Sequence, residues 1–173
     1  IPLLEGTTEI TAQASLANFL DSPSTTVTLI VSRTSSVYVN NVTGADTNPG
    51  TITEPCQTIS GAYAKFGTLD DPNNTIVLQS DITELDGAGQ LAYLNIISKT
   101  QLTIDGQGLY AIDAATQSGN RGMYVAGTGE LDLTLNELRI RNSVYWSDGA
   151  GLYVNNANAR IVLDDCVIAN NDS

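Results

Sequence analysis

Three pairs of segments along the chain share one pattern of apolar and polar positions. In each pair, a short segment with a central tyrosine is followed by a segment in which apolar and polar residues alternate. The tyrosine segments are residues 92–94, 123–125 and 152–154, and the alternating segments are residues 102–105, 133–136 and 161–164. The first shift is 31 residues for both segments, and the second is 29 for the tyrosine segment and 28 for the other. A repeat of this length, carried by short strands and tight turns, is typical of a solenoid.

The alternation within each repeat has a period of two, which is the pattern of a strand with one buried face. Coils of a parallel solenoid lie about 4.8 Å apart, so equivalent residues contact one another from coil to coil. The residues that we expect to point inward are Leu102, Ile104, Leu133, Leu135, Ile161 and Leu163, followed on the next side by Leu138, Ile140, Cys166 and Ile168. At one corner, Asp105, Asn136 and Asp164 should form a structural ladder whose short side chains bond the turning backbone. The sequence therefore predicts an all-β solenoid.

The first 35 residues lack this repeat. Residues 15–20 predict a short helical turn that ends at Asp21-Ser22-Pro23, and residues 26–31 are a β-branched run that predicts a strand. We therefore expect two parts: an N-terminal extension over residues 1–35 and a solenoid domain over residues 36–173. The extension is either an extra strand and cap or a segment that pairs with a neighbouring molecule.

The chain just ahead of the repeats predicts the start of the solenoid in a weaker form. Val37–Val39 predicts a strand, and residues 58–66 have apolar side chains at a helical spacing. Residues 75–78 predict another strand, in which Ile76 aligns with Leu102 at a shift of 26. The repeat should thus begin before residue 91.

Several motifs resemble a known superfamily. The loop Gly44–Gly50 reads G-A-D-T-N-P-G, and it is followed by Thr58-Ile59 and Ala62. This order is similar to the N-terminal part of right-handed parallel β-helix proteins of the pectate-lyase-like superfamily, where a G-x-D-x-N-P-G loop precedes a capping helix with T-I-x-x-A. Leu102–Gly108 resembles the T-I-D-G-x-G rung of that superfamily.

Two later segments, Gly149–Val154 and Val167–Asn171, resemble the Gly-rich and Asn-ended rungs of adhesin-like domains and polymorphic outer-membrane proteins. The whole resemblance covers residues 36–173. It implies a right-handed parallel β-helix of five or six coils with a short N-terminal capping helix. It does not imply one activity, because this fold is shared by lyases, hydrolases, adhesins and phage spikes.

Charge and composition exclude some classes of function. The net charge is −12 with only seven Lys and Arg, so the surface repels nucleic acid and anionic membranes. The chain has no histidine, which excludes Ser-His-Asp and Cys-His catalysis. No segment is long enough to span a membrane. The acidic, Asn- and Asp-rich composition favours an extracellular or cell-surface protein. Cys56 and Cys166 are either two free thiols or one bridge.

The resemblance raises the question of polysaccharide chemistry. Lyases and hydrolases of this fold need several acids clustered on one outer face, with an Arg or Lys base in the lyases. The outward residues Arg139 and Arg141 are the candidates, and the repeat places them beside Val167 and Ala169 on one side and Gly108 and Tyr110 on the other. No carboxylate is expected next to them, so we predict no catalytic residues.

Other polar positions have two readings. Asp81, Glu84 and Asp86 form an acidic loop that is either solvated or a surface Ca²⁺ site, and no other cofactor is expected. The triplets that match glycosylation acceptors begin at Asn41, Asn73 and Asn171.

The tyrosines of the repeats are the best binding candidates. Tyr93, Tyr124 and Tyr153 should point outward in one row, because their apolar neighbours must point inward. Such a row either stabilises the face of the sheet or binds a sugar or a partner protein.

Taken together, these patterns predict a non-catalytic structural and adhesive β-helix module. The last residues look like the end of a rung without a cap, so we expect self-association or a neighbouring domain at the open ends, and a fibre by end-to-end stacking. A glycan or a host surface is the other expected partner. The alternatives are a polysaccharide lyase or hydrolase, and a carbohydrate-binding module that uses the tyrosine row.

Overall fold

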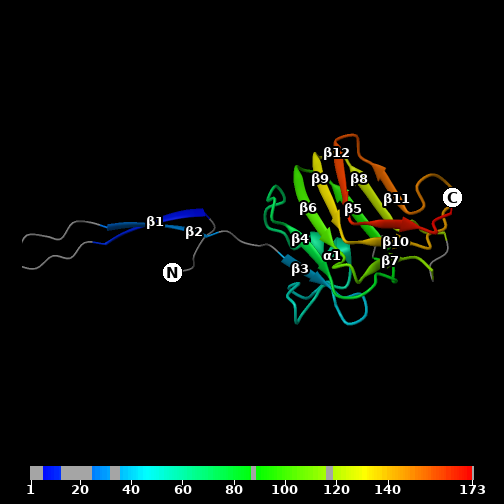
Figure 1. Ribbon diagram of the computed structural model, residues 1–173, viewed down its shortest axis with the longest axis horizontal. Helices are drawn as coiled ribbons and strands as arrows, with labels where there is room; N and C mark the ends of the chain where they lie inside the picture. The colour runs from blue at the N-terminus through cyan, green and yellow to red at the C-terminus, as the bar shows by residue number, and fades with distance from the viewer. Residues whose placement is uncertain (1–5, 13–24, 32–35, 87–88, 116–118, 173) are drawn as a thin grey trace, which may run out of the picture. The chain divides into compact units, whose positions relative to one another are not determined.

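The structure is a computed structural model, and the residues that it describes are 6–12, 25–31, 36–86, 89–115 and 119–172. The chain divides into two compact units, Ile1–Thr34 and Ser35–Ser173. The second unit holds the repeats and is the larger of the two (Figure 1).

The first unit contains a two-stranded antiparallel sheet of β1 (Gly6–Ala12) and β2 (Thr25–Val31). β2 confirms the strand predicted over residues 26–31. β1 was not predicted, because Ile10 is its only large apolar residue and the segment shows no alternation. The helical turn predicted at residues 15–20 lies outside the described residues, and pairing of this unit with a neighbouring molecule stays a prediction.

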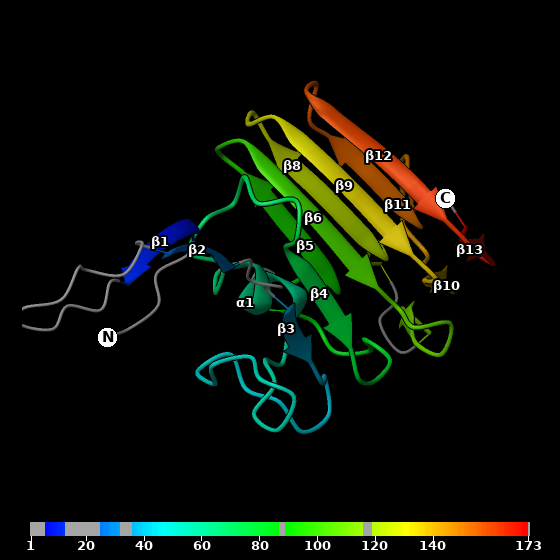
Figure 2. The same ribbon diagram turned by 60° about the vertical axis from the view of Figure 1, so that its left-hand side comes forward.

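The second unit is a parallel β-solenoid, as the repeat predicted. Its three sheets have the orders β12–β9–β6–β4–β3, β11–β8–β5 and β13–β10–β7, and every neighbouring pair is parallel (Figure 2). The strands are β3 (Ser36–Val39), β4 (Thr75–Leu78), β5 (Ala92–Ile96), β6 (Thr100–Asp105), β7 (Ala111–Asp113), β8 (Met123–Gly127), β9 (Leu131–Asn136), β10 (Arg139–Arg141), β11 (Leu152–Asn155), β12 (Ala159–Asp164) and β13 (Val167–Ala169).

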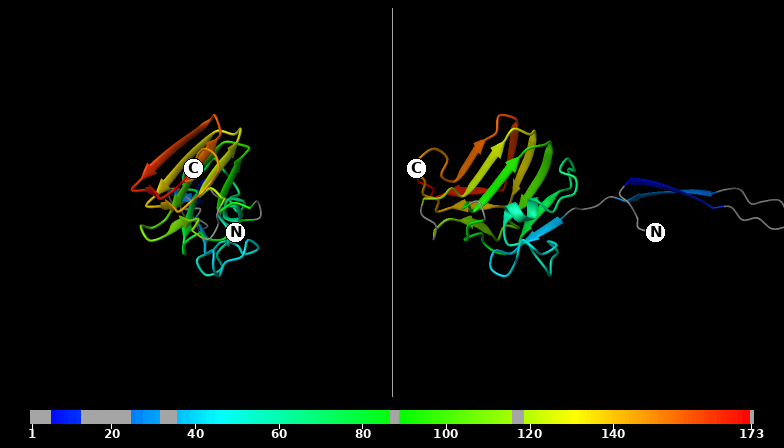
Figure 3. Two further views of the ribbon diagram at one scale, coloured as in Figure 1. Left: turned by 90° about the vertical axis from the view of Figure 1, so that its right-hand side faces the viewer. Right: turned by 180° about the vertical axis from the view of Figure 1, so that it is seen from behind.

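The solenoid has about three coils, formed by β5–β6–β7, β8–β9–β10 and β11–β12–β13 (Figure 3). The expectation of five or six coils is therefore wrong. The segment 36–78 supplies only β3 and β4, and both belong to the five-stranded sheet. The rest of that segment forms turns and a short helix rather than further coils.

The register confirms the repeat and corrects it in two places. Tyr93 lies beside Tyr124 and Tyr124 beside Tyr153, at the predicted shifts of 31 and 29. Ile76, however, pairs with Ile104 rather than Leu102, which is a shift of 28. A slip of two residues keeps the same side chains on the buried face, so alternation alone does not detect it.

The second correction concerns β10. Arg139 lies beside Ala111 rather than Gly108, although its other neighbour is Val167 as predicted. The cause is the turn between β6 and β7, residues 106–110, which is three residues longer than the turn between β9 and β10. A constant shift of 31 therefore fails on this side of the solenoid.

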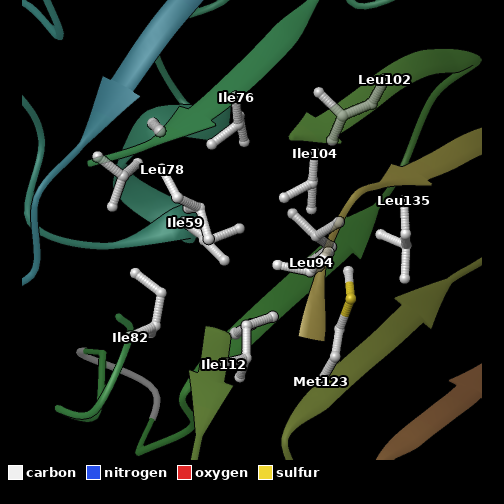
Figure 4. Close-up of a cluster of buried hydrophobic side chains, with 14 of the residues drawn as sticks. Ile59, Ile76, Leu78, Ile82, Leu94, Leu102, Ile104, Ile112, Met123 and Leu135 are labelled. Carbon is white, nitrogen blue, oxygen red and sulfur yellow. The ribbon is translucent and has the colours of Figure 1, made fainter. Parts of the chain in front are cut away.

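The inward files of apolar side chains form one core. Leu102, Ile104 and Leu135 of the five-stranded sheet face Leu94 and Met123 of the β5–β8–β11 sheet, and all five are almost fully buried (Figure 4). Burial of this apolar surface is the main stabilising contribution, at roughly 25 cal/mol per Å². It also requires that the alternate residues of each strand point outward.

The N-terminal end of the solenoid is closed by its own chain. Helix α1 (Ile59–Tyr63) begins at Thr58, whose Oγ1 accepts the N–H of Gly61 at 2.9 Å, and it buries Ile59 and Ala62 completely. α1 is shorter than the helix predicted over residues 58–66. The outer edge of β3 is also covered, because Tyr38 bonds the backbone of residues 50 and 56 through its N–H and C=O at 2.8 and 2.9 Å.

Both cysteines are free thiols, which decides between the two alternatives left by the sequence. Cys56 is fully buried near this end, and burial raises the pKa of its thiol while the charge of Lys65 opposes the change. Among the described residues, no helix is both long and apolar enough to cross a membrane.

Candidate functional site

The three tyrosines predicted as a row form one stack on the outer face of the β5–β8–β11 sheet. The ring centroids of Tyr93 and Tyr124 are 5.3 Å apart, and those of Tyr124 and Tyr153 are 5.5 Å apart, with interplanar angles of 41° and 42°. All three side chains are half-buried. Tilted pairs at these distances stabilise one another, so the stack reinforces the pairing of the coils. The stack also stays partly exposed.

Arg121 joins a fourth ring to this stack. Its Cζ atom lies 4.1 Å from the ring centroid of Tyr153, 5.3 Å from that of Tyr124 and 3.7 Å from that of Tyr145. Tyr145 belongs to the loop after β10 rather than to the repeat. A guanidinium over several aromatic faces is attracted by their ring quadrupoles, so Arg121 holds this loop against the sheet.

A glycine in the loop after β10 allows the ring of Tyr153 to lie close to the loop backbone. Gly149 has φ +71°, and a Cβ atom there would lie 2.8 Å from Cδ2 of Tyr153. A larger residue would push the ring of Tyr153 away from the loop.

Trp146 follows Tyr145 in this loop and is highly exposed, with 91% of its surface accessible. Its Nε1 atom lies beside Gly119, where a Cβ would be 3.4 Å away, and Gly119 is two residues from Arg121. We call Tyr93, Tyr124, Tyr145, Trp146, Tyr153 and Arg121 the aromatic face. The aromatic face is thus a group of partly or largely exposed side chains outside the core.

No family model, curated protein or solved structure matches this chain. Sequence reasoning found three of the six residues of the aromatic face, because those three recur in the repeat. It missed Arg121, Tyr145 and Trp146, which lie in loops that no periodicity describes. The run Tyr145-Trp146 next to a glycine-rich loop was the available signal.

The prediction that Arg141 has no acidic neighbour is wrong. The corrected register places Asp113 beside it, and Arg141 Nε donates to Asp113 Oδ2 at 2.8 Å. Its Nη2 also lies 3.6 Å from Asp81 Oδ2, one level further along the solenoid. Arg139, in contrast, donates to the carbonyl of Gly108 at 3.1 Å. The outer face of the β7–β10–β13 sheet thus holds one arginine with two carboxylates.

These carboxylates are occupied by contacts that join the coils. Asp113 Oδ1 accepts from Asn142 Nδ2 at 2.8 Å and from the N–H of Ala115 at 3.0 Å, while Asp81 Oδ1 accepts from the N–H of Ala111 at 2.8 Å. An acid or base in catalysis needs a proton or lone pair free for the substrate. The arrangement fits a clamp across three successive levels of the solenoid.

The charge of Asp113 is stabilised in the folded protein. Burial is the largest single effect and raises the pKa of the carboxyl. The hydrogen bonds from Asn142, Ala115 and Arg141, together with the charge of Arg141, outweigh burial and lower the pKa below its ordinary value. A carboxyl with a lowered folded-state pKa adds stability above the pKa of the unfolded chain, about 3.9, and loses it as the pH falls through the folded value.

We therefore expect Asp113→Asn to lower the free energy of unfolding by about 1 kcal/mol at pH 7, discounted because Arg141 is 39% exposed. The difference in the free energy of unfolding between the variant and the parent protein should be smaller at about pH 3. Urea unfolding followed by far-UV circular dichroism at both pH values measures it. Asp148→Asn, an exposed carboxylate, is the control at pH 7. An unchanged gap between the two pH values would contradict the clamp.

The predicted corner ladder stands in one register. Asp105 pairs with Asn136, and Asn136 with Asp164. Asn136 Nδ2 donates to Asp105 Oδ1 at 3.2 Å, and the same oxygen accepts the N–H of Gln107 at 2.8 Å. Asp164 contributes its backbone, whose C=O accepts from Glu137 at 2.8 Å. The ladder therefore has a structural role, because its hydrogen bonds stabilise the backbone at this corner.

The three acids of the acidic loop have different surroundings. Asp81 contacts Arg141, Asp86 is buried and accepts from Ser60 Oγ at 2.9 Å, and Glu84 is exposed. Within the described ranges, no three His, Cys, Asp or Glu residues are grouped to hold a metal ion.

The three glycosylation triplets differ in accessibility. Asn41 is 2% exposed, and its side chain bonds the backbone of residues 57, 83 and 84. Asn171 bonds the N–H of Ser143 and the C=O of Ile140. Asn73 is the most exposed of the three residues, and its Nδ2 donates to Asp71 Oδ1 at 2.9 Å. Glycosylation stays a prediction.

Proposed function

We propose that this chain is a non-catalytic structural and adhesive β-helix module of the cell surface or extracellular space, and that the aromatic face binds a neutral glycan. The observation that carries the proposal is the exposed Trp146 beside an ordered tyrosine stack. The solenoid provides a rigid support, since each tyrosine is fixed by the coil above or below it. Rigid aromatic side chains bind with little loss of conformational entropy.

Sugar chemistry fits the polar atoms of this surface. Within the described part of the chain, no hydrogen-bond partner is found for the hydroxyls of Tyr93, Tyr124 and Tyr153. They form a line of groups that both donate and accept, which suits a row of sugar hydroxyls, while the indole suits the apolar face of a pyranose. The net charge of −12 repels polyanions, so a neutral glycan is favoured.

Trp146 provides a direct test because it is the only tryptophan in the chain. Its fluorescence emission should move to shorter wavelength when a soluble neutral polysaccharide displaces water from the indole. The panel is a soluble β-glucan, a galactomannan and dextran, with polygalacturonate as the anionic arm. At least one neutral polysaccharide should give a saturable shift. No shift with any of the three would overturn the proposal, and a shift with polygalacturonate alone would overturn the neutral class.

Variants separate the aromatic face from aromatic residues in general. Trp146→Ala and Tyr153→Ala should each weaken binding about tenfold or more in calorimetry, as hot-spot aromatics do. Tyr38→Ala, on the five-stranded sheet, is the aromatic control and should bind like the parent protein. Equal loss in all three variants would point to a fold defect and contradict a site at Trp146.

The alternative, a polysaccharide lyase or hydrolase of the pectate-lyase-like kind, has one supporting observation, the Asp81–Arg141–Asp113 cluster. Its acids are already bonded to the backbone and to Arg141, and two carboxylates fall short of the cluster of several acids that such enzymes need. An assay for unsaturated products on polygalacturonate with Ca²⁺ decides between the readings. The adhesive reading predicts no product above the Arg141→Met variant.

A further inference from the structure

The tyrosine row crosses the strands of its sheet once in each coil. β5, β8 and β11 follow one another along the solenoid (Figure 2), and their register places Tyr93, Tyr124 and Tyr153 directly beside one another. The ring centroids are 5.3 and 5.5 Å apart. The row therefore runs along the solenoid axis, with one phenol group per coil at a nearly constant spacing.

The hydroxyls of this row are the groups that remain for a ligand. Each ring packs against the next one in the row, and the guanidinium of Arg121 lies over Tyr124 and Tyr153. The ring faces are thus largely in contact with the protein. The three hydroxyl oxygens have no partner among the described residues, and none of them is fully buried. A ligand consequently meets a line of hydroxyls more than a line of ring faces.

The direction of the ligand follows from the side chains on either side of the row. A ligand along β8 would meet a single tyrosine, because the next residue on the outer side of that strand is Ala126. A ligand along the solenoid axis meets the hydroxyls of all three tyrosines in turn. The row therefore suits a linear polymer whose repeat has the length of one coil.

We propose, as an extension of the neutral-glycan binding proposed above, that the ligand is a β-1,4-linked glycan that lies along the solenoid axis with one sugar residue per coil. A β-1,4-linked pyranose chain is an extended ribbon, and its advance per residue is close to the coil spacing of about 4.8 Å. An α-1,4-linked chain curves, and an α-1,6 linkage adds a rotatable bond. Holding three residues of either chain in line therefore costs more conformational entropy.

The chemistry of a hydroxyl row also fits this ribbon. Successive residues of a β-1,4-linked chain are turned by half a rotation, so each edge of the ribbon presents ring hydroxyls and hydroxymethyl groups in alternation. A tyrosine hydroxyl both donates and accepts a hydrogen bond, so it can bond either group. The same side chain in every coil is thus compatible with the alternation.

Calorimetry with oligosaccharides of defined linkage tests the length of the repeat and the linkage together. The β-1,4-linked probes are cellobiose, cellotriose, β-1,4-mannobiose and β-1,4-mannotriose, and the α-linked probes are maltotriose and isomaltotriose. In at least one β-1,4 series, the trisaccharide should bind about fivefold more tightly than the disaccharide, because it reaches a third hydroxyl. The same trisaccharide should bind about tenfold more tightly than either α-linked trisaccharide, which is less well preorganised.

A variant of the first coil tests the placement of one sugar per coil. Tyr93→Phe removes one hydroxyl and keeps the ring in the stack. It should weaken trisaccharide binding about fivefold and disaccharide binding less, because the disaccharide can also lie across Tyr124 and Tyr153. The matched control is Tyr38→Phe on the five-stranded sheet, which should leave both affinities as in the parent protein. An equal loss for the two oligosaccharides in Tyr93→Phe would overturn this placement.

The outcomes separate this proposal from the broader one. Equal affinity for the α-linked and β-1,4-linked trisaccharides, or no gain from disaccharide to trisaccharide, would overturn the β-1,4 linkage and leave neutral-glycan binding standing. The same holds if none of the six oligosaccharides binds while a neutral polysaccharide still shifts the fluorescence of Trp146. No response to any oligosaccharide or polysaccharide would overturn both proposals.

Discussion

Leu135→Ala is expected to lower the free energy of unfolding by about 2–5 kcal/mol, which is the usual range for truncation of a fully buried leucine. Leu135 lies in the middle of the inward file of the five-stranded sheet, with Ile104 on one side and Leu163 on the other. The coils on both sides fix its cavity, so the gap left by alanine does not collapse. Urea unfolding followed by far-UV circular dichroism measures the change.

The same file contains the matched control. Leu163 has the same inward position in the last coil but is 50% exposed. Leu163→Ala should lower the free energy of unfolding by about 1 kcal/mol or less, because truncation of a half-exposed side chain removes little buried apolar surface. Equal losses of stability at the two positions would contradict the difference in burial between Leu135 and Leu163.

Gly127→Ala is the second substitution with a large expected effect. Gly127 has φ +112°, a conformation that L residues rarely adopt, and a Cβ there would overlap the carbonyl oxygen of Ile96 in the adjacent coil. The backbone of β5 cannot move aside without breaking its pairing with β8. We expect a loss of roughly 3 kcal/mol in the free energy of unfolding, from strain and steric overlap together.

Gly67 is the control for this substitution, since a Cβ at Gly67 meets no atom within 4 Å and its φ is ordinary. Gly67→Ala should be neutral or slightly stabilising, because alanine reduces the freedom of the unfolded chain. A thermal melt of the two variants compares them directly. Equal melting temperatures for Gly127→Ala and Gly67→Ala would contradict the close approach of the two coils at Ile96.

The strands of the solenoid were predictable because apolar alternation and burial have the same physical cause. The repeat fixed which residues stack between the tyrosine strands, since both segments shift together by 31 residues. It failed where turns differ in length. The turn at 106–110 has five residues and those at 137–138 and 165–166 have two, so Asp113 was placed away from Arg141.

The backbone conformations at the corners of the coils were not predicted from the sequence. Gln107, Glu137 and Asp165 all have left-handed φ values of 54°, 47° and 46° at one corner of successive coils. Gln and Glu rarely adopt this conformation, and only the stacking of coils imposes it. At the next corner, Asn142 and Asn170 have φ values of 60° and 56°, and asparagine tolerates them well. The ladder predicted from Asp105, Asn136 and Asp164 therefore located the first corner but not its left-handed conformation, and the conformation at the second corner was not predicted.

The candidate site was half predictable for the same reason. Tyrosines inside strands inherit the repeat, whereas Arg121 and Trp146 depend on how two loops fold over the sheet. A guanidinium between aromatic rings is a tertiary contact with no local pattern.

The central claim is that residues 29 and 31 positions apart stack from coil to coil, and the tyrosine rings test it most directly. Nuclear Overhauser effects between ring protons, assigned with single Tyr→Phe variants, report on pairs at the observed 5.3 and 5.5 Å. We predict contacts between Tyr93 and Tyr124 and between Tyr124 and Tyr153, and none between Tyr93 and Tyr153. Absence of both predicted contacts, or a direct contact between Tyr93 and Tyr153, would contradict the solenoid register.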